Sequence, residues 1–184
     1  MNEAIKVLKQ RRSIRKYKPD PVPDDVLQTI VECGLLAPSA MNQQKWHFAV
    51  VQGHTLEKMA SVMRERWLQS GNERLVARAK EGASPFHGAP CVIVISGDPE
   101  ARFIQIDCGG AVENLALAAE ALGLGSCVMA APSMVLESPE GAEIKEAIGV
   151  PEGYVHMISL AVGYRDCEIP APHPRKPDLV SWVK

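Results

Sequence analysis

The chain has 184 residues, of which 46% are hydrophobic and 23% are charged, values ordinary for a globular protein. This composition excludes disorder of the whole chain and predicts a single domain over residues 1–184. A formal net charge of −2 and the lack of an apolar run of about 20 residues argue against nucleic-acid and membrane partners.

The cysteines indicate a reducing compartment. They lie at wide and irregular intervals without a Cys-x-x-Cys pair, so neither a metal site nor a redox dithiol is expected. The first residues also lack the apolar segment of a secretion signal. We therefore expect a cytoplasmic protein with reduced thiols. The five cysteines are Cys33, Cys91, Cys108, Cys127 and Cys167.

The first half of the chain alternates helices with loops. Helices are predicted over 1–10 and 24–36, where apolar side chains recur at helical spacing, and the proline-rich segment 19–23 between them must be a loop. A polar loop then leads into a strand over 47–52 and an amphipathic helix over 55–69.

The second half contains the apolar centre of the predicted fold. Residues 70–88 are polar with three glycines and are compatible with a mobile excursion. The continuous apolar run 89–95 is typical of a strand buried on both faces. Residues 106–122 are rich in Ala and Leu almost all the way round, which predicts a buried central helix that Gly123 ends. The remaining predictions are strands over 126–130 and 155–162 and a helix over 140–148.

The tail, residues 166–184, contains four prolines and cannot fold into a compact unit of its own. It must therefore lie along another surface. Together these elements predict an α+β domain in which a central mixed β-sheet is flanked by helices and packed against one buried helix.

The strongest candidate site is a basic segment after the first helix. Arg11, Arg12, Ser13 and Arg15 place three guanidinium groups and a hydroxyl within five residues. Guanidinium donors match phosphate oxygens in planar pairs, so the segment predicts an anion site. The alternative is structural, because basic residues at a helix C-terminus interact favourably with the helix dipole.

Three further segments are weaker candidates. The polar loop 38–46 could hydrogen-bond a heteroaromatic ring or could simply plug an aromatic side chain into the core. Gly123 and Gly125 could let a flat ligand approach the backbone or could simply end the helix. Arg175, between prolines, could be a placed cation or part of a solvated tail. No motif of a serine hydrolase, zinc protease or P-loop enzyme is present.

Taken in order, these segments resemble the nitroreductase family of flavin-dependent oxidoreductases. The resemblance is carried by Arg-Arg-Ser-Ile-Arg at 11–15, by the loop and strand at 37–48, by the helix and glycines at 107–126, by Val-Gly-Tyr at 162–164 and by Pro-Arg-Lys-Pro at 174–177. It covers nearly the whole chain, and the joint pattern is far more specific than any part of it.

The resemblance implies a homodimer with two FMN molecules in its interface. Arg11 and Ser13 would meet the phosphate and ribityl chain with Arg12 beside them, Arg175 would complete the phosphate clamp, and Arg15 would be the cation at the pyrimidine edge of the flavin. The partner subunit would contribute the loop residues, and the strand after Gly125 would offer backbone N–H groups near N5. The full implied set is Arg11, Arg12, Ser13, Arg15, Pro38, Ser39, Ala40, Met41, Asn42, Gln44, Val128, Met129, Ala130, Ala131 and Arg175.

The resemblance also implies the activity. FMN would take a hydride from NAD(P)H and reduce a small electron-poor acceptor, such as a nitroaromatic, a quinone or an enone, in a ping-pong cycle. No nucleophile would be needed on the protein, and Arg15 would stabilise the charge of the reduced flavin. Two alternatives stay open: a relative with a narrow reduced-flavin task, such as reductive dehalogenation or flavin fragmentation, and a flavin-binding module without turnover.

The sequence departs from the family pattern at two places. Lys45 stands where proline is usual, and Ala130 with Ala131 stands where some members carry an acidic residue or a glycine. The family also differs most over residues 64–88, where a lid above the flavin and the choice of substrate are expected.

Overall fold

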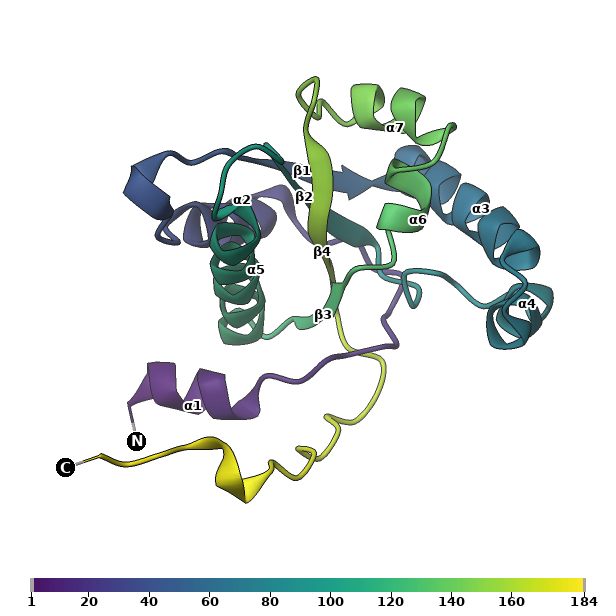
Figure 1. Cartoon of the computed structure of the whole chain (residues 1–184). Coiled ribbons are helices and arrows are strands. Elements are labelled where there is room, and N and C mark those ends of the chain that lie inside the picture. Colours follow the sequence, from purple (N-terminus) through teal and green to yellow (C-terminus); the bar gives the residue numbers. More distant parts are fainter. Residues whose placement is uncertain (1, 184) are drawn as a thin grey trace.

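The sheet of the protein separates two groups of helices in the computed structural model, which describes residues 2–183 (Figure 1). In chain order the elements are α1 (Glu3–Gln10), α2 (Asp24–Leu35), η1 (Ala40–Asn42), β1 (Trp46–Gln52), α3 (Gly53–Gln69), α4 (Glu73–Lys80), β2 (Cys91–Gly97), α5 (Ile104–Ala121), β3 (Gly125–Met129), α6 (Ser133–Leu136), α7 (Gly141–Ala147), β4 (Val155–Gly163) and η2 (Pro177–Leu179). The α+β class is confirmed.

The four strands follow the order β1-β2-β4-β3, and all three pairings are antiparallel. This differs from the mixed sheet expected. The connections from β1 to β2 and from β3 to β4 join neighbouring strands at one end of the sheet, and β4 separates β2 from β3, the two strands that the α5 crossover makes parallel. Among residues 2–183 the only parallel pairing is an isolated bridge, in which Ser13 pairs with Ser126 of the edge strand β3.

Alternate strand residues enter two different cores, as the pleat of a sheet requires. Val92 and Val94 of β2 pack with α3, α6 and α7, whereas Ile93 and Ile95 pack with α2 and α5. Every residue of β2 is buried, which confirms the prediction of a strand covered on both faces.

Only one side of α5 is covered within a single chain. Leu115 and six other side chains of the helix are buried against the sheet and α2. On the other side Ile106 is 71% exposed. A side chain added at Gly109 or Gly110 would meet open space. The apolar composition of this helix therefore exceeds what its own chain covers.

The polar stretch 70–88 is more ordered than its sequence suggested. Asn72 caps α4 by accepting hydrogen bonds from the N–H groups of Arg74 and Leu75. Leu75 packs against the core formed with α3. The tail beyond residue 165 is extended and exposed, and it runs beside α1 (Figure 1).

Candidate functional site

The basic segment after α1 is held in an extended form along the sheet edge. Ile14 donates its N–H to the carbonyl of Ser126 at 2.8 Å, and Lys18 donates to the carbonyl of Tyr164 at 2.9 Å. Ile14 and Tyr17 are buried, and the Tyr17 hydroxyl donates to the Ile14 carbonyl at 2.8 Å. These contacts leave the residues between them little freedom.

Three of the predicted anion ligands lie around one buried thiol. Burial raises the pKa of Cys127, whereas the charge of Arg15, a hydrogen bond from Ser13 and the charge of Arg11 lower it. In an extended segment residues 11, 13 and 15 share one side, opposite the inward-facing Ile14. The alternation therefore gathers these three groups beside β3.

Arg11 is only partly engaged by its own chain. Its Nε lies 3.3 Å from Oε1 of Glu113 on α5. Among residues 2–183 the Arg11 side chain forms no other hydrogen bond. Its Nε is therefore engaged by Glu113, while its two terminal nitrogens can still donate to an anion.

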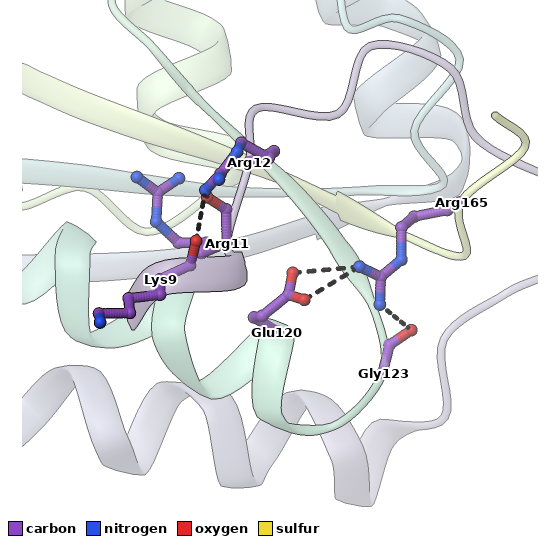
Figure 2. Close-up of polar contacts among 6 residues, drawn as sticks. All are labelled: Lys9, Arg11, Arg12, Glu120, Gly123 and Arg165. Atoms are coloured by element: carbon purple, nitrogen blue, oxygen red, sulfur yellow. Dashed lines mark hydrogen bonds and ion pairs between the residues drawn. The ribbon is translucent and has the colours of Figure 1, made fainter. Parts of the chain in front are cut away.

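Arg12 points away from this group. Its terminal nitrogen donates to the carbonyls of Lys9 at 2.8 Å and Arg11 at 2.7 Å (Figure 2). These carbonyls belong to the end of α1, so Arg12 has the role that the helix-dipole alternative described. Its Nε is buried without a partner among residues 2–183.

A partly buried ion pair fixes the turn that leads into β3. Arg165 donates to both carboxylate oxygens of Glu120 at 3.1 Å and to the carbonyl of Gly123 at 3.0 Å (Figure 2). At Gly125 an added Cβ would lie 2.7 Å from Cγ of Arg165 and 3.0 Å from Ile14. The protein's own side chains are thus sufficient to require glycine at position 125.

The segment after α4 places His87 within the electrostatic influence of Arg15. Burial lowers the pKa of His87, and the charges of Arg78 and Arg15 lower it further. His87 has a φ of 60°, which is strained for a residue other than glycine. Arg78 is itself held by its guanidinium, 4.8 Å from the centre of the Trp67 ring.

The loop before β1 is the second half of the predicted site. Asp107 on α5 accepts the N–H of Ala40 with both carboxylate oxygens at 3.2 Å. Met41 is 83% exposed, whereas Trp46 is buried and confirms the alternative of an aromatic plug. Lys45, whose role was unassigned, lies 3.5 Å from Asp98.

The two halves do not meet within one chain. Asp107 and Glu113, which contact the loop and Arg11, are six residues apart on α5, which corresponds to about 9 Å of rise and about 240° of rotation. Val128, Met129, Ala130 and Ala131 continue from Cys127 and belong with the arginine half. Arg175 lies in the exposed tail, and among residues 2–183 it forms no hydrogen bond with Arg11.

The sequence interpretation missed the residues that hold the site together. Glu113, Asp107 and Arg165 each contact a residue more than 40 positions away, and no local pattern indicates such partners. Cys127 is a further residue that the sequence did not place in the site. Its position two residues after Gly125 is the signal that could have indicated it.

The fold is that of an α+β protein with arginine side chains gathered along one edge of its sheet. The model of the Nitroreductase family matches residues 8–164. The chain therefore belongs to the nitroreductase family, as its motifs predicted. Within residues 2–183 no helix is both long and apolar enough to cross a bilayer.

Individual relatives agree with this assignment. A nitroreductase with bound FMN from Bacteroides fragilis superposes with a TM-score of 0.91 at 29% identity, and one from Desulfitobacterium hafniense with 0.90 at 31%. Both comparisons cover 100% of each chain. An FMN reductase [NAD(P)H] of Bacillus subtilis is 30% identical over 96% of this chain and 71% of its own length. An iodotyrosine deiodinase of Thermotoga neapolitana is 27% identical over 95% of this chain and 94% of its own length.

Proposed function

We propose that the protein is an FMN-dependent oxidoreductase that uses NAD(P)H to reduce a small electron-poor aromatic or carbonyl compound. The observation that carries the proposal is the attachment of the segment 11–15 along β3, through the Ser13–Ser126 bridge and the hydrogen bond from Ile14 to Ser126, which sets Arg11, Ser13 and Arg15 on one side at the sheet edge. Membership of the nitroreductase family, with FMN named in its solved relatives, supports the choice of ligand.

The donor set fits the cofactor. An FMN phosphate carries about −1.5 to −2 charges at neutral pH, which calls for cations and hydroxyl donors. Arg11 has unused guanidinium donors and Ser13 supplies a hydroxyl, so these two would hold the phosphate end. Arg15 is two residues further along the same side, and would lie at the ring. Arg12, turned toward α1, would not contact the ligand.

When bound, FMN supplies the redox chemistry by taking two electrons from NAD(P)H and passing them to the acceptor. The residues of the chain would bind the cofactor and orient it. Arg15 is a fixed cation that favours negative charge at the nearby edge of a bound ring. His87 is near enough to Arg15 and Arg78 for both charges to lower its pKa.

We propose further that the site is completed by a second copy of the chain. The loop over 38–42 is exposed at Met41 and Asn42 and lies away from the arginine half, while the uncovered face of α5 lies between them. A two-fold assembly over this face would bring the loop of one protomer to the arginines of the other. The exposed apolar side chains of the tail, residues 166–184, would then pack across the partner, and Arg175 would reach the phosphate from there.

The location in the cytoplasm also stays a proposal. All five cysteines are unpaired with one another, and Cys91 and Cys108 are buried with their pKa values raised to about 12 by desolvation. Reduced, buried thiols of this kind suit a reducing compartment.

The absorbance spectrum of the purified protein tests the function. We expect flavin bands that NADH or NADPH bleaches without oxygen, and that a nitroaromatic, quinone or enone restores. Arg11→Glu should lose FMN, whereas the matched Arg12→Gln should keep it. A protein that lacks flavin bands and does not bind added FMN would contradict the proposal.

The similarity to an iodotyrosine deiodinase favours one second candidate, a narrow reductive dehalogenation. In that case NAD(P)H would leave the bound flavin oxidised, a chemical reductant would bleach it, and the reduced protein would release halide from a halogenated phenol. Steady oxidation of NAD(P)H with several quinones would exclude both this candidate and a module without turnover.

A further inference from the structure

The loop before β1 contains an unusual run of strained backbone. Met41, Asn42 and Gln44 have φ angles of 52°, 53° and 49°, and none of them is glycine. Asn tolerates this left-handed region, but Met and Gln rarely enter it. Such conformations persist only where the surroundings impose them.

Most of the contacts that impose it come from within the loop. The N–H of Gln44 donates to Oγ of Ser39 at 3.1 Å, and Nε2 of Gln44 donates to Oδ1 of Asn42 at 3.0 Å. The N–H of Asn42 donates to the carbonyl of Ser39 at 2.9 Å. These bonds shape the loop but do not attach it to the rest of the protein.

Asp107 supplies the attachment at the centre of the loop. It lies in the first turn of α5, and both of its carboxylate oxygens accept the N–H of Ala40, immediately before the strained residues. A hydrogen bond to an ionised acceptor is stronger than one between neutral groups. Because α5 is packed on the sheet, its carboxylate is a rigid anchor.

The strained residues Met41 and Asn42 are not buried against their own chain. Met41 is 83% exposed, and Asn42 is exposed beside it. A loop that needed only to connect α2 to β1 could relax into ordinary turns. The maintained conformation therefore serves something outside its own chain.

We propose that Asp107 is a positioning residue of the cofactor site, which holds loop 39–44 in its strained form so that Met41 and Asn42 are presented to the FMN of the partner protomer. The inference rests on the proposed function, since it needs FMN and a second copy of the chain. It adds a named carboxylate, outside the ligand contacts, on which the affinity of the site depends.

Asp107→Ala and Asp107→Asn test the anchor, with Asp25→Ala, which removes an exposed carboxylate from the first turn of α2, as the matched control. In cofactor-free protein, we expect faster hydrogen exchange over 37–45 in Asp107→Ala alone. We expect its affinity for added FMN to fall about tenfold, with most of it kept in Asp107→Asn, whose amide oxygen still accepts. Unchanged exchange, or wild-type FMN affinity in Asp107→Ala, would overturn the inference.

Met41→Gly provides a second test that does not remove the anchor. Glycine accepts the left-handed backbone without strain, so this variant should melt at a higher temperature yet bind FMN more weakly. Greater stability with unchanged FMN affinity would show that the strain does not serve the ligand, and would overturn the inference. If wild-type protein bound no FMN at all, the proposed function would fail, while the exchange measurement would still decide whether Asp107 holds the loop.

Discussion

Arg15 has a different task from the other arginines of its segment. Its side chain is exposed, and its charge lowers the pKa values of Cys127, Tyr17 and His87. Arg11 is partly neutralised by Glu113 and Arg12 is bound to the end of α1, so Arg15 is the cation that we propose for the flavin ring.

For Arg15→Ala we expect FMN to bind more weakly and its reduction by NADH to slow by about 10². The loss of a fixed cation removes stabilisation from the reduced ring. Stopped-flow absorbance under anaerobic conditions measures the rate, and Arg15→Lys should recover part of it. Reduction of Arg15→Ala at the wild-type rate would show that the assignment is wrong.

His156 makes the stability of the fold depend on pH. It is buried, with Nε2 2.8 Å from the hydroxyl of Ser159, and desolvation lowers its pKa to about 4 against the opposing charge of Glu137. The unfolded chain therefore binds this proton at a higher pH than the native chain does. Its contribution to stability is complete above about pH 6.5 and is lost as the pH falls toward 4.

Melting temperatures between pH 7 and pH 4.5 should therefore decline less in His156→Gln than in wild-type protein. The variant itself is less stable at pH 7, because Ser159 loses its partner. His173→Gln, in the exposed tail, should follow the wild-type decline. An equal decline of the melting temperature in all three proteins would show that His156 is not the source of the pH dependence.

At the scale of elements, the packing of α2 on α5 depends on one small residue. A Cβ at Gly34 would lie 2.5 Å from Cδ2 of the fully buried Leu115. Gly34→Ala should lower the free energy of unfolding by about 1–3 kcal/mol through overpacking. Denaturant titration measures the loss. Combining Gly34→Ala with Leu115→Ala should cost less than the sum of the single changes, since the second makes room for the first. Additive losses would mean that the two do not collide.

How far the sequence could predict this protein differs from element to element. The apolar run of β2 and the Ala- and Leu-rich composition of α5 were sufficient to predict these two elements, because apolar residue types indicate burial directly. Helix α4 escaped notice although Asn72 is a good cap, since the surrounding glycines and charges resemble a loop. Arg12 was grouped with its neighbours because basic composition does not show which side of an extended chain a residue occupies. Asp107 could not be found at all, since its partner lies 67 residues away.

At the scale of the whole molecule, the uncovered face of α5 is the proposed contact between copies of the chain. Gly110→Arg would place a long cation there, where the single chain has open space. We expect the variant to fold with a wild-type circular dichroism spectrum, to elute as a monomer and to lose FMN. Glu146→Arg, on the exposed side of α7 across the sheet, should stay dimeric. A dimeric Gly110→Arg that keeps FMN would place the contact elsewhere.

Helix α1 contains no buried residue, and Ile5 and Leu8 on it are 45% and 53% exposed. A helix of eight residues so sparsely covered opens locally at little free-energy cost. Its C-terminal neighbour is Arg11, so an anion bound there would tie down the end that otherwise frays. The first eleven residues should accordingly be trimmed by a protease such as trypsin when cofactor is missing and resist it when cofactor is bound. Within a cell, the lifetime of the chain would then follow the supply of flavin, because the empty form alone offers a cleavable end.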